Sequence, residues 1–173
     1  MSESIENAER RIDEADDVPS FEDVLKVVSK PREEATIMAE ELGKRFSQEE
    51  LSPVIKAAII RMLDRGDFGW PKFALELFPF VGLDDDIKKA AKRVLLTKID
   101  SHEGGGESGI FRIMRWFDIP EGYLRTKLVR EKAKKVIISF LRQGSESQAR
   151  QTAMEIFRFT EEEFNELKSE AKS

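Results

Sequence analysis

The 173-residue sequence contains no cysteine, one histidine and one tyrosine, and it has no long hydrophobic run. Without cysteine the chain can form neither a disulfide framework nor a thiolate metal site, which suits a reducing compartment. No apolar stretch approaches the roughly 18–20 residues that a membrane span requires, and the acidic first residues lack the apolar core of a signal peptide. We therefore expect a cytoplasmic protein that does not associate with membranes.

The sequence also lacks the signals of β-structure. No segment alternates apolar and polar residues, and no Asn-Gly or Asp-Gly turn joins two such segments. Apolar residues recur instead at the i, i+3, i+4, i+7 spacing of amphipathic helices. The four clearest stripes are Ile55, Ala58, Ile59, Met62 and Leu63; Trp70, Phe73, Ala74, Leu77 and Phe78; Ile110, Ile113, Met114 and Phe117; and Val129, Ala133, Val136, Ile137, Phe140 and Leu141. The fold is therefore predicted to be all-α.

Capping signals mark the ends of these predicted helices. Three segments have the spacing of the capping box, in which a hydroxyl and a Glu or Gln three residues later satisfy free amides: Ser47–Glu50, Ser145–Gln148 and Thr160–Glu163. Gly66 and Gly144 follow apolar stripes and suit a left-handed C-cap. Pro79 should end the helix that precedes it, because proline lacks the amide hydrogen of a helical residue.

The first 19 residues differ in composition from the rest of the chain. They carry seven acidic and two basic residues and offer little apolar surface to bury. We predict that residues 1–19 form a disordered acidic tail, with a frayed helix over part of it as the alternative. Residues 20–173 are predicted to form a single helical-repeat domain.

A short apolar motif recurs along the predicted helical region. Ala74–Phe80 reappears as Ala153–Phe159, and degenerate copies occur at Ile110–Trp116 and Ala39–Leu42. The three best copies begin 36 and 43 residues apart, within the range for two-helix repeats. A single helix pair cannot bury both of its faces, so neighbouring pairs would stack on a shared core.

In this period and apolar pattern the chain resembles the HEAT and armadillo class of α-solenoids over roughly residues 21–167. The tetratricopeptide signature is absent. The resemblance implies a short α-solenoid of about three to four antiparallel helix pairs, and its handedness would follow from the same resemblance. The alternative is an irregular helical bundle in which similar amphipathic helices mimic a repeat.

No motif indicates catalysis, cofactor binding or metal binding. The glycine spacing of residues 104–109 follows a predicted helix, whereas a dinucleotide-binding loop follows a strand, so a flexible linker is favoured. His102 has neither a second histidine nor a cysteine to share a metal. The acids at 84–86 lack the pattern of a calcium loop and suit the start of a helix. We therefore predict no enzyme, cofactor, metal site or small-molecule substrate.

Charge is distributed unevenly along the chain. Residues 1–87 carry 11 basic and 21 acidic residues, whereas residues 88–150 carry 15 basic and 7 acidic ones. Many of the basic residues fall on two predicted helices that would be equivalent in adjacent repeats, the second of them including Arg125. The candidate partner-binding residues, with one nearby aromatic, are Lys88, Lys89, Lys92, Arg93, Trp116, Arg125, Lys127, Arg130, Lys132 and Lys135.

The favoured function is that of a binding or adaptor module for another protein, because helical repeats expose extended surfaces. The alternative is binding of the phosphate backbone of a nucleic acid through the basic helices, with Trp116 and Tyr123 stacking on bases. For the lysines and arginines themselves, the favoured interpretation is that they form a solvated face, which offsets the charge of the acidic residues.

Overall fold

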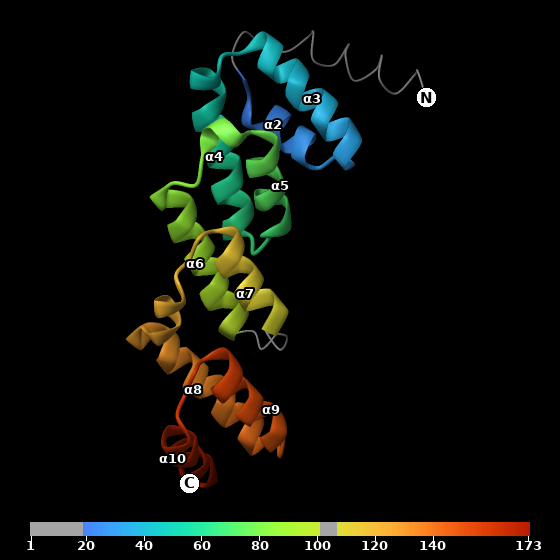
Figure 1. The fold of residues 1–173 in the computed structure, drawn as a ribbon. Helices are drawn as coiled ribbons and strands as arrows, with labels where there is room; N and C mark the ends of the chain where they lie inside the picture. Colours follow the sequence, from blue (N-terminus) through green and yellow to red (C-terminus); the bar gives the residue numbers. More distant parts are fainter. Residues whose placement is uncertain (1–18, 101–106) are drawn as a thin grey trace. The chain divides into compact units, whose positions relative to one another are not determined.

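The computed structural model describes residues 19–100 and 107–173 (Figure 1). Within these residues every regular element is helical and no strand occurs, which confirms the all-α prediction. The predicted tail up to residue 18 and the residues 101–106, which include His102, lie outside the described part of the chain. Among the helices that are described, none has both the length and the apolarity needed to cross a bilayer.

The chain divides into two compact units, Met1–Ile87 and Lys88–Ser173. The boundary falls three residues into helix α6 (Asp85–Asp100). Each unit has its own apolar interior and is considered by itself below.

The first unit contains two longer helices, α3 (Arg32–Arg45) and α4 (Gln48–Asp64), and two shorter ones, α2 (Phe21–Val28) and α5 (Gly69–Leu77), connected by short loops (Figure 1). Its last complete element is the 3-10 turn η1 (Pro79–Val81). Helix α2 contacts α3, α4 and α5, and α5 also contacts α3 and α4. The core is built from the inward face of α4, whose predicted stripe from Ile55 to Leu63 is buried, together with Val24, Leu42 and Phe78.

The second unit is organised around one long helix. Its elements are the rest of α6, α7 (Glu107–Trp116), the 3-10 helix η2 (Glu121–Arg125), α8 (Lys127–Arg142), α9 (Glu146–Gln151), the π-helix η3 (Thr152–Ile156) and α10 (Glu161–Lys172). Helix α8 contacts η2, α9, η3 and α10. Its predicted apolar stripe is buried from Val129 to Phe140, as one would expect for a helix with neighbours on several sides.

Two of the three predicted capping boxes are present. The side chains of Ser47 and Thr160 accept hydrogen bonds from backbone amides at the starts of α4 and α10. The glutamate side chain three residues later accepts in turn from the backbone amide of Ser47 or Thr160. The prediction at Ser145 is wrong, because its side chain makes no capping bond. The Ser145 amide donates instead to the Phe140 carbonyl at 2.9 Å, which closes the turn after α8.

Glycine and proline end helices as predicted. Gly66 and Gly144 adopt φ values of 85° and 77°, in the left-handed region where a side chain would be strained. Helix α5 ends at Leu77, and Pro79 begins the short 3-10 turn η1. The short length of α5 therefore follows from the proline just beyond it.

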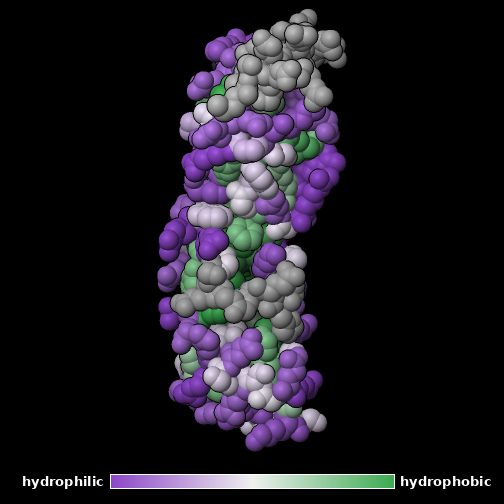
Figure 2. Space-filling view, turned by 90° about the vertical axis from the view of Figure 1, so that its right-hand side faces the viewer, coloured by the Kyte–Doolittle hydropathy of each residue, from purple (hydrophilic) through white to green (hydrophobic). Residues whose placement is uncertain are grey.

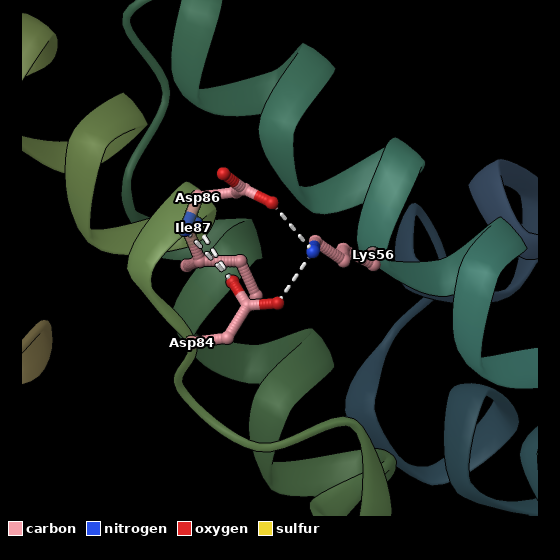
Figure 3. A network of polar contacts seen from close by, with 4 residues as sticks. All are labelled: Lys56, Asp84, Asp86 and Ile87. Carbon is pink, nitrogen blue, oxygen red and sulfur yellow. Dashed lines mark hydrogen bonds and ion pairs between the residues drawn. The ribbon is translucent and has the colours of Figure 1, made fainter.

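Lys56 of α4 and two aspartates near the start of α6 form a polar network within the first unit (Figure 3). Lys56 Nζ lies 2.5 Å from Asp84 Oδ2 and 2.8 Å from Asp86 Oδ2. Asp84 Oδ1 also accepts from the backbone amides of Asp86 at 3.1 Å and Ile87 at 3.0 Å. The prediction that these acids cap a helix is confirmed.

The network raises the pKa of Lys56 and lowers the pKa of Asp84. Hydrogen bonds to Asp84 and Asp86 raise the pKa of Lys56 to about 12. Partial burial works to raise the pKa of Asp84, but the bonds from Lys56 and from the Ile87 amide outweigh it, so this pKa lies below its ordinary value. The network thus favours the charged form of both groups.

Candidate functional site

The apolar stripe of α5 is only partly covered by the rest of the first unit. Ala74 and Phe78 are buried, but Phe73 and Leu77 are half-buried, and 39% of Trp70 is exposed. Single exposed apolar residues are common on proteins. Trp70 differs because its ring centroid lies 5.9 Å from that of Phe73, so its exposed surface continues into that of the stripe.

The facing side of α3 carries short side chains. Thr36, Ala39 and Gly43 recur at three- and four-residue spacing, which puts them on one face of the helix. A Cβ atom added to Gly43 would meet no atom within 4 Å. The face of α3 opposite α5 therefore carries only short side chains, which cover the aromatic side chains of α5 only in part.

Between these walls lies a groove of about 380 Å³, which we call the α3–α5 groove. Its walls are formed by Thr36, Ala39 and Gly43 on one side and by Phe73 and Leu77 on the other, and it also borders Leu51, Phe78 and Phe80. Figure 2 views the molecule from the side on which Figure 1 draws α3 and α5, and green hydrophobic atoms are visible there among purple hydrophilic ones. The groove combines an apolar floor and wall with charged residues at its border.

Three charged side chains border the groove, and one of them reaches across it. The guanidinium carbon of Arg32 on α3 lies 5.6 Å from the centroid of the Phe73 ring, and its Nη2 lies 3.3 Å from Glu76 Oε2 on α5. The Arg32 side chain is 77% exposed. Exposed ion pairs contribute about 0–1 kcal/mol and cation–π contacts at exposed sites about 0.5–1 kcal/mol, so little free energy holds Arg32 in this position.

Glu40 is the third charged residue of the groove. It makes no ion pair with any residue in the described part of the chain, whereas Glu76 is paired with both Arg32 and Lys72. The α3–α5 groove therefore combines exposed aromatic surface with one uncompensated carboxylate.

The predicted basic residues of α6 lie on that helix, and most have local partners. Lys88 Nζ lies 2.7 Å from Asp118 Oδ2. Lys92 Nζ lies 5.2 Å from the centroid of the Tyr123 ring. Lys89 and Arg93 also take part in interactions within the protein.

The second group of predicted basic residues is divided between two elements. Arg125 ends η2 and does not lie on α8 as predicted, because Thr126 is extended (ψ 148°) and interrupts the helical path. On α8, Lys132 pairs with Asp100, and Arg130 pairs with Glu163 and stacks on Phe159. The exposed members without an ion pair among the described residues are Arg125, Lys127 and Lys135.

Trp116, the aromatic candidate, lies at the end of α7 and is half-buried. The Arg112 guanidinium lies 5.6 Å from its ring centroid. One face of this indole therefore already has a cation near it, as does the Tyr123 ring, which leaves less aromatic surface for stacking on a base.

Sequence analysis missed the α3–α5 groove. The signal that could have found it is the combination of a proline-terminated apolar helix, the Trp70 stripe, with a preceding helix whose facing residues are Thr36, Ala39 and Gly43. No family model, curated protein or solved structure matches the chain. What the groove binds must therefore be inferred from its own residues.

Proposed function

We propose that the chain is a protein-binding module of stacked helix pairs, and that it holds a segment of a partner protein in the α3–α5 groove. One observation carries this proposal: the apolar stripe of α5 stays open beside a wall of short side chains on α3. Covering this stripe would remove aromatic surface from water, at about 25 cal/mol for each Å² buried. Exposed tryptophan next to a hollow is also typical of the residues that dominate protein–protein binding.

The pattern of contacts within each unit supports an arrangement of stacked pairs. In the first unit α2 contacts α3 and α4, and α4 contacts α5; in the second, α8 contacts α9 and α10. Helices α2 and α8 therefore each contact both the next helix and the one after it, as helices of adjacent pairs in a repeat array do.

Ion pairs recur at a similar separation in sequence and add to this support. They join residues 30 to 33 positions apart: Lys56 and Asp86, Lys88 and Asp118, Asp100 and Lys132, and Arg130 and Glu163. Each of these pairs lies within one unit. A recurring separation of this size is expected when one helix pair contacts the next.

Binding of nucleic-acid phosphates is the second candidate. It is supported by the excess of basic residues in the second unit, where 18 lysines and arginines face 13 acids, and by the exposure of Arg125, Lys127 and Lys135. We place it second because Lys88, Arg130 and Lys132 have acidic partners within the protein. Phosphates would have to compete with those carboxylates.

The proposed function can be tested by selecting random 16-residue peptides displayed on phage against the immobilised full chain. Recovered peptides are then measured against the variant Gly43→Leu, which adds a side chain at a position that lines the groove and has open space around its Cβ atom. Gly109→Leu on α7 is the matched control, because it also places leucine at a helical glycine with open space around it. Leucine has the higher helix propensity by about 1 kcal/mol, so neither variant should lose stability, and thermal unfolding checks this.

We expect peptides that bind the parent chain and the Gly109→Leu variant equally and bind the Gly43→Leu variant at least tenfold more weakly. Recovery of no peptide, or of peptides that bind Gly43→Leu as tightly as the parent, would contradict the proposed function. If neutralising Lys127 and Lys135 abolishes peptide binding and Gly43→Leu does not, the binding site lies in the second unit.

A further inference from the structure

We infer that the occupant of the α3–α5 groove is an amphipathic α-helix whose apolar stripe is flanked by lysine or arginine. This inference rests on the proposed function and specifies the chemistry of the partner. It is carried by three features: the charge of the first unit, the charges that border the groove, and the length of its aromatic stripe.

The first unit is strongly acidic. Residues 1–87 carry 11 basic and 21 acidic residues, a net charge of −10, of which residues 19–87, the part that the structure describes, contribute −5. Residues 88–173 carry 18 and 13, a net charge of +5. A net charge of this size attracts a basic partner and repels an acidic one, and it raises the association rate at low ionic strength. The unit that contains the groove therefore selects for positive charge.

The residues that line the groove also have a net negative charge. Its charged residues are one arginine, Arg32, and two glutamates, Glu40 and Glu76. Arg32 already pairs with Glu76, so the charge that lacks a partner belongs to Glu40. A lysine or arginine beside the apolar stripe of a bound helix would supply the missing counter-charge.

A bound cation would also compete with Arg32 for its two weak contacts. Arg32 covers the Phe73 ring and pairs with Glu76, but its side chain is 77% exposed and can move away at little cost in free energy. Removing Arg32 would uncover Phe73 and leave Glu76 with Lys72 alone as its ionic partner. The variant Arg32→Ala should therefore bind a basic helix more tightly than the parent does.

The dimensions of the groove suit a helix. The open stripe of α5 runs from Trp70 to Leu77, seven helical steps or about 10 Å at 1.5 Å per residue, and its members Phe73 and Leu77 line the groove. Apolar side chains at positions i, i+4 and i+7 of a partner helix cover the same length. In the described part of the chain there is no strand edge to which an extended peptide could add.

The test uses three synthetic 16-residue helices, each held helical by a lactam staple and each with leucine at i, i+4 and i+7. They differ only in four flanking positions, which are all lysine, all glutamine or all glutamate. We expect the full chain to bind the lysine helix at least tenfold more tightly than the glutamate helix, with glutamine between, and the difference to shrink as salt is added.

Two variants connect this preference to the groove. Glu40→Lys should weaken the lysine helix about threefold to tenfold and strengthen the glutamate helix, and Arg32→Ala should strengthen the lysine helix about twofold to fivefold. Glu22→Lys is the control, because it changes the net charge by the same amount on α2, away from the residues that line the groove. It should change the binding of the lysine helix less than Glu40→Lys does.

The outcomes separate this inference from the proposed function. Equal binding of all three helices, each abolished by Gly43→Leu, overturns the basic partner and leaves the groove as a binding site. Binding of none, while the phage library yields peptides sensitive to Gly43→Leu, overturns the helical partner alone. If neither the helices nor the library peptides depend on Gly43, both proposals are wrong.

Discussion

Helices α5 and α8 carry similar apolar stripes, but the stripe of α8 is buried and that of α5 is partly exposed. On α8, Val129, Ala133 and Ile137 are fully buried, because η2, α9, η3 and α10 all contact that helix. On α5, Trp70 keeps 39% of its surface exposed, and its ring lies 5.9 Å from that of Phe73, which borders the α3–α5 groove. Periodicity shows which face of a helix is apolar, but the neighbouring elements decide whether that face becomes core or remains available to a partner.

The largest expected difference between the two stripes is in stability. Ile137→Ala on α8 removes a fully buried side chain and should lower the free energy of unfolding by about 2–5 kcal/mol. Trp70→Ala on α5 should cost less than Ile137→Ala, because 39% of Trp70 is exposed to water whereas Ile137 is fully buried. Urea unfolding of both variants measures the difference. Equal losses would mean that Trp70 belongs to the core.

A smaller effect distinguishes two helix starts of the second unit that look alike in sequence. Thr160→Ala removes a capping hydroxyl and should cost about 0.5–2 kcal/mol, whereas Ser145→Ala should change stability by less than about 0.5 kcal/mol. Both substitutions remove a hydroxyl, although Thr160→Ala also removes a methyl group, and thermal unfolding compares them directly. A loss at Ser145 as large as that at Thr160 would restore the capping box that the sequence predicted.

A still smaller effect should come from titration of the Lys56 network in the first unit. Since the pKa of Asp84 is lowered in the folded protein, the stability it contributes is present above the ordinary pKa near 4 and is lost as the pH falls through the folded value. Asp84→Asn should keep the helix cap but lose the ion pair, at a cost below about 1 kcal/mol at neutral pH.

Denaturant unfolding at several pH values gives the expected signature of that pair. The difference in unfolding free energy between the parent and Asp84→Asn should shrink as the pH falls below about 4 and through the lowered pKa of Asp84. At the basic end the contribution of Lys56, whose pKa is raised to about 12, should fade as the pH rises from its ordinary value toward that one. A difference that does not change with pH would show that the pair contributes nothing.

Features encoded by a few neighbouring residues could be predicted from the sequence. The helix-ending Gly66, Gly144 and Pro79 and the caps at Ser47 and Thr160 are local, because each depends on atoms within one turn of the chain. The prediction at Ser145 failed because a turn bond to the Phe140 carbonyl positions its backbone instead.

Features that depend on distant residues could not be predicted. The sequence shows that Lys88 and Lys132 are basic, but not that Asp118 and Asp100 lie beside them. The groove could not be predicted for the same reason, since its walls come from α3 and α5, which are about 30 residues apart in sequence.

Tryptophan fluorescence gives the most direct test that the open stripe of α5 is a binding surface, because the chain has only Trp70 and Trp116. Each is replaced in turn by phenylalanine, and the lysine helix or a library peptide without tryptophan is added to saturation. With Trp70 as the remaining tryptophan, binding should shift the emission to shorter wavelength and protect it from acrylamide; with Trp116 remaining, neither should change. A saturated complex in which Trp70 stays as accessible to acrylamide as in the free protein would contradict the account.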